Sequence, residues 1–407
     1  MSEIKHPGFA AFWSDNYFPA LDGLRALSIL LVFFVHIHED RPEIRGWIGV
    51  HIFFVLSGFL ITTLLLRERE HYGRISLRGF YVRRFFRIAP IYYLVLAAYV
   101  LVVLLMHDAV RWTEFKLALP YLLTFMQEFR PAASGYVFGQ AWSLGYEEKF
   151  YLLWPLLTVL LFPFKRRSTF IVLTFVAALL LLPFGAAASY GSLFLGSLVA
   201  IVLAKSTSSG IRQPLSQIPT GLALALVVAA YAAFWYYPNL ALVFSASMAL
   251  LIGTMVLRVS WLRSLLEHPW IVIVGKRSYA MYLIHVLVIH AVERLAALLH
   301  MNVWYAVVPA AYLVSFAGAT VLFYLIERPC LAYGRRLSKM ARERPFDSQS
   351  GASAASASPA SDHLESAVTP IEREEPGVTN AFAGHGDEVS EGVSLCWASV
   401  APQKENK

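Results

Sequence analysis

Long apolar stretches dominate the pattern of hydrophobic and polar positions along this 407-residue chain. About 20 apolar residues in an α-helix cross the roughly 30 Å hydrocarbon core of a bilayer. Ten stretches of near that length predict membrane-spanning helices around residues 21–37, 48–66, 88–106, 149–164, 168–184, 188–204, 218–236, 240–257, 271–292 and 304–325. The predicted fold is therefore all-α, a polytopic membrane protein with about ten transmembrane helices.

Lys and Arg are distributed unevenly between the segments that join these stretches. With the N-terminus in the cytoplasm, the cytoplasmic segments hold 23 Lys and Arg residues and the outer segments hold six. Cytoplasmic loops of membrane proteins carry an excess of these residues, so both termini are predicted to be cytoplasmic. Arg25 interrupts the first stretch and no small-residue cleavage site follows it, so we expect a retained helix and not a cleaved signal peptide.

Composition agrees with this class of protein, since 57% of the residues are apolar and 15% are charged. The expected units are a cytoplasmic N-terminal segment (1–18), a membrane domain (19–332) and a basic, then acidic, mostly disordered cytoplasmic tail (333–407). The basic residues follow the loops and form no single basic module, which argues against nucleic-acid binding. Cys330 and Cys396 both fall on the predicted reducing side, so no disulfide is expected.

Arg25 and His36 lie inside the first apolar stretch, where ionisable side chains are costly and are usually kept for function. Eleven residues on an α-helix turn through about 1100°, or three turns plus roughly 20°, and rise about 16 Å. The two side chains are therefore predicted to share one helix face, with Arg25 toward the cytoplasmic end and His36 toward the outer end. Such a pair is compatible with a transport pathway, a proton relay or an enzyme that holds the two ends of a long, charged substrate.

Arginine residues also cluster between the second and third stretches, in residues 78–90 (RGFYVRRFFRIAP). Arg84 and Arg87 are three residues apart and share a helix face, directly before Pro90, which is expected to begin or break a helix. The planar guanidinium group suits phosphate because it donates two parallel hydrogen bonds. Spacing alone leaves two alternatives open, a phosphate-binding site and an anchor for anionic lipid headgroups.

Six motifs, in order along the chain, resemble those of the acyltransferase-3 family of integral membrane acyltransferases. They are residues 19–26 (PALDGLRA) followed by His36, 46–62 (GWIGVHIFFVLSGFLIT), 80–90 (FYVRRFFRIAP), 141–155 (AWSLGYEEKFYLLWP), 275–285 (GKRSYAMYLIH) and 327–329 (ERP). The resemblance runs from about residue 17 to 330, and the ten predicted spans agree with the usual number in that family. Each motif alone is weak, but six in sequence make a specific match.

The resemblance implies an enzyme that takes an acyl group, most often acetyl, from cytoplasmic acyl-CoA and delivers it to a carbohydrate hydroxyl at or beyond the outer face of the membrane. At matching positions it implies that His36 is catalytic and that Arg25, Arg84 and Arg87 take part in donor binding or transfer. The expected acceptor is an exopolysaccharide, an O-antigen or a lipid-linked sugar at a bacterial inner membrane. Acyl-CoA is then a donor substrate, and no permanently bound cofactor is expected.

The residue pattern agrees with a coenzyme A donor, which carries phosphates at one end and a thioester at the other. Its site should be cationic near the cytoplasm, where Arg84 and Arg87 are predicted, and catalytic deeper in, near His36. We expect neutral His36 to accept the proton of the attacking hydroxyl as a general base, with a covalent acyl carrier as the second alternative. A packed or hydrogen-bonded core histidine is the structural alternative.

Two acidic residues, Glu147 and Glu148, follow the long predicted outer segment 107–148 and are candidate catalytic residues. One of them is expected to orient His36 or to bind sugar hydroxyls, and a structural cap is the alternative. Neighbouring residues on a helix point about 100° apart, so the two are not expected to share one role.

Four further residues are candidates for binding the acceptor, namely Trp142, Ser143, Tyr279 and His285. An interfacial aromatic anchor is the alternative for Trp142. Ser143 precedes Glu147 by four residues, so an N-cap is its alternative. Packing or a helix end is the alternative for Tyr279 and His285.

Several positions depart from the family's pattern, and they concern the acceptor side. His51 stands where the family often has Asp, Lys149 where Gln is usual, and Gly145 and Tyr146 replace smaller or aliphatic residues. Some relatives also carry an extracytoplasmic hydrolase-like domain, and the polar, predicted cytoplasmic residues 345–407 are not expected to form one. Direct transfer to a lipid-linked or nascent glycan is therefore the simpler expectation.

The sequence favours acyl transfer over two other classes of function, metal catalysis and transport. No metal site is predicted, because His36 and His38 would point about 200° apart on a helix and no H-E-x-x-H motif occurs. A polytopic transporter or exporter of a glycan or small anionic solute is the alternative function. Transporters commonly have related halves with paired Gly- or Pro-interrupted spans, and the sequence contains no convincing internal repeat.

Overall fold

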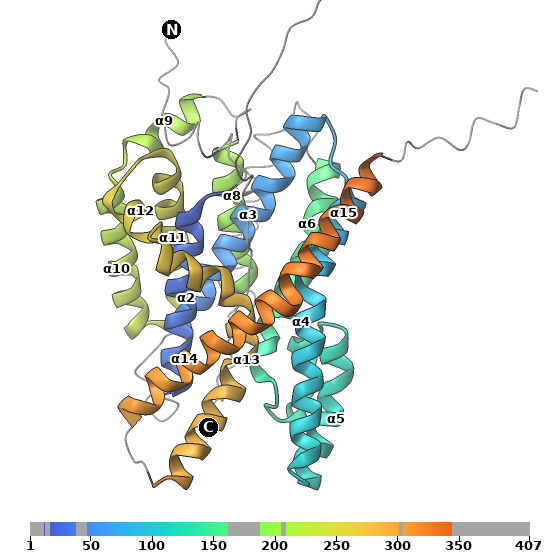
Figure 1. Cartoon of the computed structure of the whole chain (residues 1–407). Coiled ribbons are helices and arrows are strands. Elements are labelled where there is room, and N and C mark those ends of the chain that lie inside the picture. The colour runs from blue at the N-terminus through green and yellow to red at the C-terminus, as the bar shows by residue number, and fades with distance from the viewer. Residues whose placement is uncertain are drawn as a thin grey trace, which may run out of the picture.

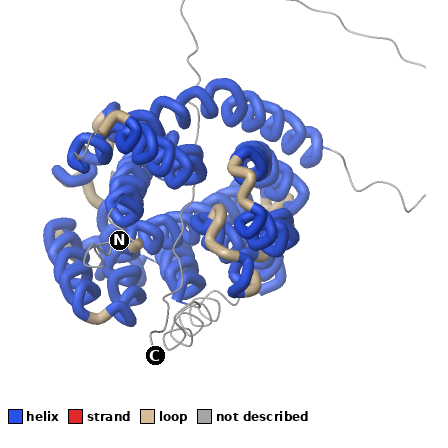
Figure 2. The backbone as a smooth tube through the Cα atoms, turned by 90° about the horizontal axis from the view of Figure 1, so that it is seen from below, coloured by secondary structure: helices blue, strands red, loops and turns tan. Residues whose placement is uncertain are grey.

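The structure is a computed structural model that describes residue 12 and residues 17–37, 47–161, 188–204, 209–300 and 304–343. Helices and connecting loops make up these ranges, without a strand (Figure 2). The main helices are α2 (Pro19–Ile37), α3 (Ile48–Tyr72), α4 (Leu77–Leu105), α5 (Ala109–Leu123), α6 (Trp142–Leu161), α8 (Ala188–Val202), α9 (Ser209–Gln217), α10 (Thr220–Tyr236), α11 (Ala241–Leu257), α12 (Trp261–Leu266), α13 (Pro269–Leu298), α14 (Trp304–Leu322) and α15 (Arg328–Glu343). The all-α prediction is confirmed for the described ranges.

Nine of the ten predicted spans fall on helices, and the remaining one, 168–184, lies outside the described residues. Four helical runs are long and apolar enough to cross a membrane, namely α3, α4, α13 and the continuous run Val307–Met340. Three shorter apolar helices, α8, α10 and α11, accompany them. The total of ten spans and the cytoplasmic placement of both termini stay predictions.

The helix that carries the arginine cluster differs from its prediction. α4 begins at Leu77, well before the predicted span, because the Ser76 hydroxyl accepts a hydrogen bond from the Gly79 backbone N–H at 3.1 Å and caps the helix. Pro90 lies inside this helix, so the expectation that it begins or breaks a helix was wrong. The arginines are therefore held on the same rigid element as the apolar residues that follow them.

The C-terminal helical run contains a change of helix type. A π-helical turn, Phe323–Glu327, joins α14 to α15 without a break in the helix. The basic first part of the predicted tail, up to residue 343, belongs to α15, which packs against α4. The rest of the predicted tail lies outside the described residues.

Helices α2 and α3 occupy the centre of the bundle. In Figure 1, α9, α10 and α11 lie on one side of this pair and α4, α5 and α6 lie on the other. α2 packs most extensively against α13, and α3 packs most extensively against α8. The helix that carries the first motif therefore packs against α13, which carries the fifth.

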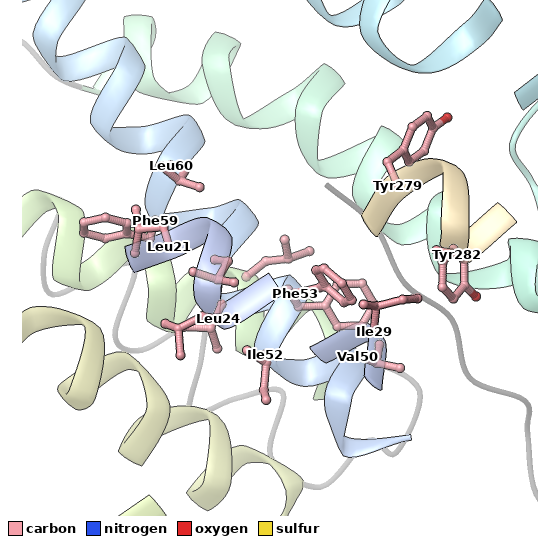
Figure 3. Close-up of a cluster of buried hydrophobic side chains, with 14 of the residues drawn as sticks. Leu21, Leu24, Ile29, Val50, Ile52, Phe53, Phe59, Leu60, Tyr279 and Tyr282 are labelled. Carbon is pink, nitrogen blue, oxygen red and sulfur yellow. The ribbon is translucent and has the colours of Figure 1, made fainter. Parts of the chain in front are cut away.

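The apolar core surrounds α3. In this helix, 94% of the most apolar window is buried, as expected for a helix that is hydrophobic on all sides. Figure 3 shows Phe53 and Phe59 of α3 packed with Leu21, Leu24 and Ile29 of α2. This packing holds α2 in a fixed position inside the protein.

Small residues let the central helices approach closely. A methyl group at Gly275 of α13 would overlap the backbone carbonyl of Asp22 on α2. Gly58 of α3 and Gly196 of α8 meet the Leu193 and Val55 carbonyls in the same way. Helix interfaces in membranes are rich in such small residues because they permit tight backbone packing.

We predict that Gly275→Ala destabilises the protein by about 1 to 3 kcal/mol, because the added methyl group must displace backbone atoms of α2. The matched control is Gly221→Ala on α10, where the added methyl group meets nothing within 4 Å. Thermal unfolding of the purified proteins in detergent measures the difference. Equal midpoints for the two variants would contradict the close α2 and α13 contact.

Candidate active site

Arg25 lies at one end of the site, on α2, and is 2% exposed. Its guanidinium group forms an ion pair with Asp22, one helical turn earlier, and Asp22 also accepts a hydrogen bond from the Tyr17 hydroxyl at 2.9 Å. The Nη2 atom of Arg25 is buried and has no hydrogen-bond partner among the described residues. Buried polar atoms are nearly always paired, so this donor is a candidate ligand contact.

Arg84 and Arg87 of α4 are buried as well, at 8% and 5% exposure. Arg87 forms an ion pair with Glu327 of the π-helical turn, at 2.5 Å between Nη1 and Oε1. The Arg84 guanidinium lies over the Tyr151 ring at 5.0 Å from its centroid. A lipid headgroup anchor would keep its charged end at the membrane surface, so the burial of both side chains argues against that alternative.

Glu147 connects the arginines of α2 and α4. Its carboxylate is fully buried, lies beside the Ser57 hydroxyl, and is within electrostatic range of both Arg84 and Arg25. Neither carboxylate oxygen has a hydrogen bond of good geometry within the described part of the chain. The structure therefore brings Arg25, Arg84 and Glu147 together from three helices.

Glu148 faces a different direction from Glu147, as expected for adjacent helical residues. It is only partly buried, and the cations near it are Arg84 and Lys149. Of the two candidate acids, Glu147 is the one within electrostatic range of buried arginines on both α2 and α4.

His36 lies near the other end of α2, and its ring meets the ring of His285 from α13. The ring centroids are 4.7 Å apart and the planes are 80° apart. His36 Nδ1 is 3.0 Å from the Val32 carbonyl oxygen, and His285 Nδ1 is 2.5 Å from the Tyr282 carbonyl oxygen. The two predicted candidates, 249 residues apart in the chain, therefore form one histidine pair.

A turn before α6 lies against α13 near this pair. The Tyr282 hydroxyl, on a side chain labelled in Figure 3, donates to the Gln140 carbonyl at 2.5 Å. The Gln140 amide donates to the Tyr99 hydroxyl at 2.8 Å and to the Leu283 carbonyl at 3.1 Å. Gln140 was not predicted, because no spacing rule identifies a loop amide that reaches a distant helix.

The first residues of α6 also lie in this region. Ser143 is fully buried beside Tyr282, and its hydroxyl makes no cap hydrogen bond, so the N-cap alternative was wrong. The physical reason is that α6 already begins at Trp142, directly after the turn Gly139–Ala141. The Trp142 indole packs edge-on against Tyr146, and its Nε1 atom is buried without a partner among the described residues.

Tyr279 has a structural role in the described packing. Its hydroxyl donates to the Ile88 carbonyl at 2.7 Å and ties α13 to α4. Its placement favours the packing alternative over acceptor binding.

Two positions that depart from the family's pattern face away from the histidine pair. Lys149 forms an ion pair with Glu128 at 2.5 Å and donates to the Phe125 carbonyl. His51 Nδ1 lies 2.8 Å from the Ser192 hydroxyl, which in turn contacts the Ser245 hydroxyl. These departures therefore concern helix and loop packing in the structure.

Sequence reasoning missed the acids that compensate the buried arginines. Asp22 and Glu327 both lie in the quoted motifs, but neither was assigned a role. A buried arginine needs a nearby acid because an unpaired buried charge is strongly destabilising. That rule signals that such partners exist, although the sequence does not identify which acid meets which arginine.

No group of three or more His, Cys, Asp or Glu side chains that could hold a metal ion occurs in the described ranges. The arrangement instead offers buried guanidinium groups with the carboxylates of Asp22, Glu147 and Glu327 at one end, and two imidazoles at the other. Chemically, the first set can bind phosphate, and the second can accept or carry a proton.

Comparison with known proteins gives a consistent result. The family model described as an acyltransferase domain matches residues 18–328. The peptidoglycan O-acetyltransferase OatA of Listeria monocytogenes is 26% identical over 352 residues, which cover 78% of this chain and 56% of the relative. No solved structure matches.

Two further relatives have provisional names. A Bacillus subtilis protein provisionally named peptidoglycan O-acetyltransferase is 30% identical over 360 residues, covering 79% of this chain and 56% of the relative. A Staphylococcus aureus protein provisionally named O-acetyltransferase is 27% identical over 331 residues, covering 71% and 53%. The chain thus spans about half the length of the curated relatives it matches.

We predict that Glu327→Leu destabilises the protein by about 3 to 5 kcal/mol, because Arg87 would remain buried without its ion-pair partner. The double variant Arg87→Leu with Glu327→Leu should recover much of this loss. Glu267→Leu is the control, since it breaks the more exposed Arg263 pair and should cost no more than about 1 kcal/mol. Thermal unfolding in detergent tests the ranking, and equal costs for the two single variants would contradict it.

Proposed function

Because this chain belongs to the acyltransferase-3 family of membrane acyltransferases, we propose that it transfers an acyl group, most simply acetyl, from acyl-CoA to a hydroxyl of a glycan. The observation that supports this proposal best is the arrangement of α2, which carries buried Arg25 at one end and His36 at the other. Relatives named as O-acetyltransferases, one of them for peptidoglycan, support acetyl as the group and a glycan as the acceptor.

The donor is proposed to bind with its phosphate end at the arginines. Arg84 is buried over an aromatic ring, and Arg25 has a buried donor atom that no described residue satisfies. Guanidinium groups recognise phosphate through paired, charge-assisted hydrogen bonds. Arg87 contributes positive charge from the same face of α4, although its ion pair with Glu327 makes it the most constrained of the three.

Glu147 is proposed to position the arginines and not to react with the acyl group. It lies within electrostatic range of Arg25 and Arg84, and no described contact joins it to His36. A carboxylate near two guanidinium groups reduces their mutual repulsion and favours their placement on this side of the site. This role replaces the expectation that Glu147 orients His36.

His36 is proposed to be the general base. Its Nδ1 is within hydrogen-bond distance of the Val32 carbonyl, which can only accept, so Nδ1 carries the proton and Nε2 is the unprotonated atom of the neutral ring. Nε2 takes the proton of the acceptor hydroxyl as its oxygen attacks the thioester carbonyl carbon. The new C–O bond forms, the C–S bond breaks, and the proton passes to the departing sulfur to give the free thiol.

The proposed acceptor is an extracytoplasmic or lipid-linked glycan of a bacterium, approached from the His36 end of α2. The protein is a multi-pass membrane protein with several helices of spanning length, and the three relatives described above come from bacteria. Donor and acceptor would then reach the histidine from opposite ends of helix α2. This placement rests on the predicted cytoplasmic position of the arginine end.

We predict that His36→Ala lowers acyl transfer by about a hundredfold or more, because it removes the proposed general base. The variant should still insert and bind coenzyme A, since the arginine end is unchanged. Mass spectrometry of surface glycans from cells that express each variant measures the added acyl groups. His290→Ala, at an exposed position of α13, is the control, and wild-type product from His36→Ala would disprove the catalytic role.

Arg84→Ala should weaken coenzyme A binding by about tenfold or more, because it removes a buried charge-assisted contact to phosphate. Arg78→Ala on the same helix changes net charge equally, but Arg78 is exposed, so its coenzyme A affinity should stay near the wild-type value. Calorimetric titration of coenzyme A into detergent-purified protein makes the comparison. Equal affinities for the two variants would show that Arg84 does not bind the donor.

A further inference from the structure

His285 is a fully buried histidine with one nitrogen unpaired. Its Nδ1 lies 2.5 Å from the Tyr282 carbonyl oxygen, and a carbonyl can only accept a hydrogen bond. Nδ1 therefore carries the proton, and Nε2 of the neutral ring is an acceptor. This Nε2 is buried and has no partner among the described residues.

A packing role alone would not explain this atom. A buried acceptor without a donor is destabilising, and a histidine kept for packing could be replaced by an apolar aromatic residue. The backbone carbonyl of Tyr282 also holds the ring in one tautomer and one orientation. The unpaired lone pair of His285 is therefore presented in a fixed direction.

His36 and His285 carry the same hydrogen-bond pattern from two different helices. In each ring Nδ1 meets a backbone carbonyl, and the ring centroids are 4.7 Å apart. The two imidazole rings are thus held in contact. A hydroxyl group has only one proton to donate, so a hydroxyl that donates to His36 cannot also donate to His285.

The neighbouring loop adds a further acceptor. Gln140 uses its amide nitrogen for Tyr99 and Leu283, and its Oε1 atom is buried without a donor within the described ranges. His285 and Gln140 both connect to Tyr282, one through the Tyr282 carbonyl and the other through the Tyr282 hydroxyl. Two buried acceptors next to Tyr282, His285 Nε2 and Gln140 Oε1, therefore have no donor among the described residues, and hydroxyl groups of a ligand can supply such donors.

We propose that His285 binds a second hydroxyl of the acceptor, next to the hydroxyl that His36 deprotonates, so that the site selects an acceptor with neighbouring hydroxyl groups. This inference rests on the acyl transfer proposed above and specifies its acceptor. His285 Nε2 accepts a hydrogen bond from the second hydroxyl, and no bond to that oxygen forms or breaks. A polyhydroxylated sugar meets this requirement, whereas a simple alcohol leaves one nitrogen unpaired.

The test compares two substitutions that differ in reach. Asn at position 285 can still donate to the Tyr282 carbonyl from the place of Nδ1, but it has no atom at the place of Nε2. Gln extends farther and can present an oxygen near that place. His290→Asn, one and a half turns along the same helix at an exposed position, is the matched control.

Each protein is expressed in cells that lack the native gene, and the acyl groups on surface glycans are counted by mass spectrometry. We expect His285→Asn to lower the product about tenfold or more, His285→Gln to lower it less, and His290→Asn to leave it unchanged. Coenzyme A affinity in detergent should stay within about twofold of wild type for all three. The position of the residual acyl groups, mapped by NMR, should spread over more than one hydroxyl in His285→Gln.

Two results would overturn the proposal for His285. One is wild-type product from His285→Asn. The other is a loss of product together with a loss of coenzyme A affinity, which would indicate a structural role. Failure of the proposed function is a different result, because the wild-type protein itself would then add no acyl group to the surface glycans.

Discussion

Compensation of buried charge is the constraint on which this structure depends. Three arginines lie inside an apolar bundle, and each has an acid within reach. Arg25 meets Asp22 within one helix, Arg87 of α4 meets Glu327 of the π-helical turn, and Arg84 lies near Glu147 of α6. An uncompensated buried charge would cost several kcal/mol, so these pairings restrict how the helices can be placed around α2.

The two ends of α2 are built for different kinds of chemistry. Around Arg25 the polar groups are charged and come from three helices. Around His36 they are neutral imidazole, hydroxyl and amide groups, which suit a sugar better than a phosphate. Buried apolar residues such as Leu24 and Ile29 separate the two ends of α2 and hold the helix against its neighbours. One helix thus combines anion recognition with proton transfer while keeping the two environments apart.

Much of this arrangement follows from sequence pattern, because apolar length and helical periodicity are local properties. The helices, the shared face of Arg25 and His36, and the unequal directions of Glu147 and Glu148 are of this kind. The contact of His36 with His285 is different, since it depends on how α2 and α13 pack, and periodicity within one helix contains no such information. Lys149 illustrates the same limit, because its partner Glu128 lies in an irregular loop.

The π-helical turn at Phe323–Glu327 sets the angular phase of the helix that follows it. A π turn holds one more residue than an α turn, so α15 is rotated by about 100° relative to an uninterrupted α-helix. In the observed phase, Gly334 packs on Phe86 and the Ser338 hydroxyl meets Arg83. The number of residues in this run therefore matters as well as their identity, because one added or deleted residue would rotate α15 by about 100° and move Gly334 and Ser338 away from α4.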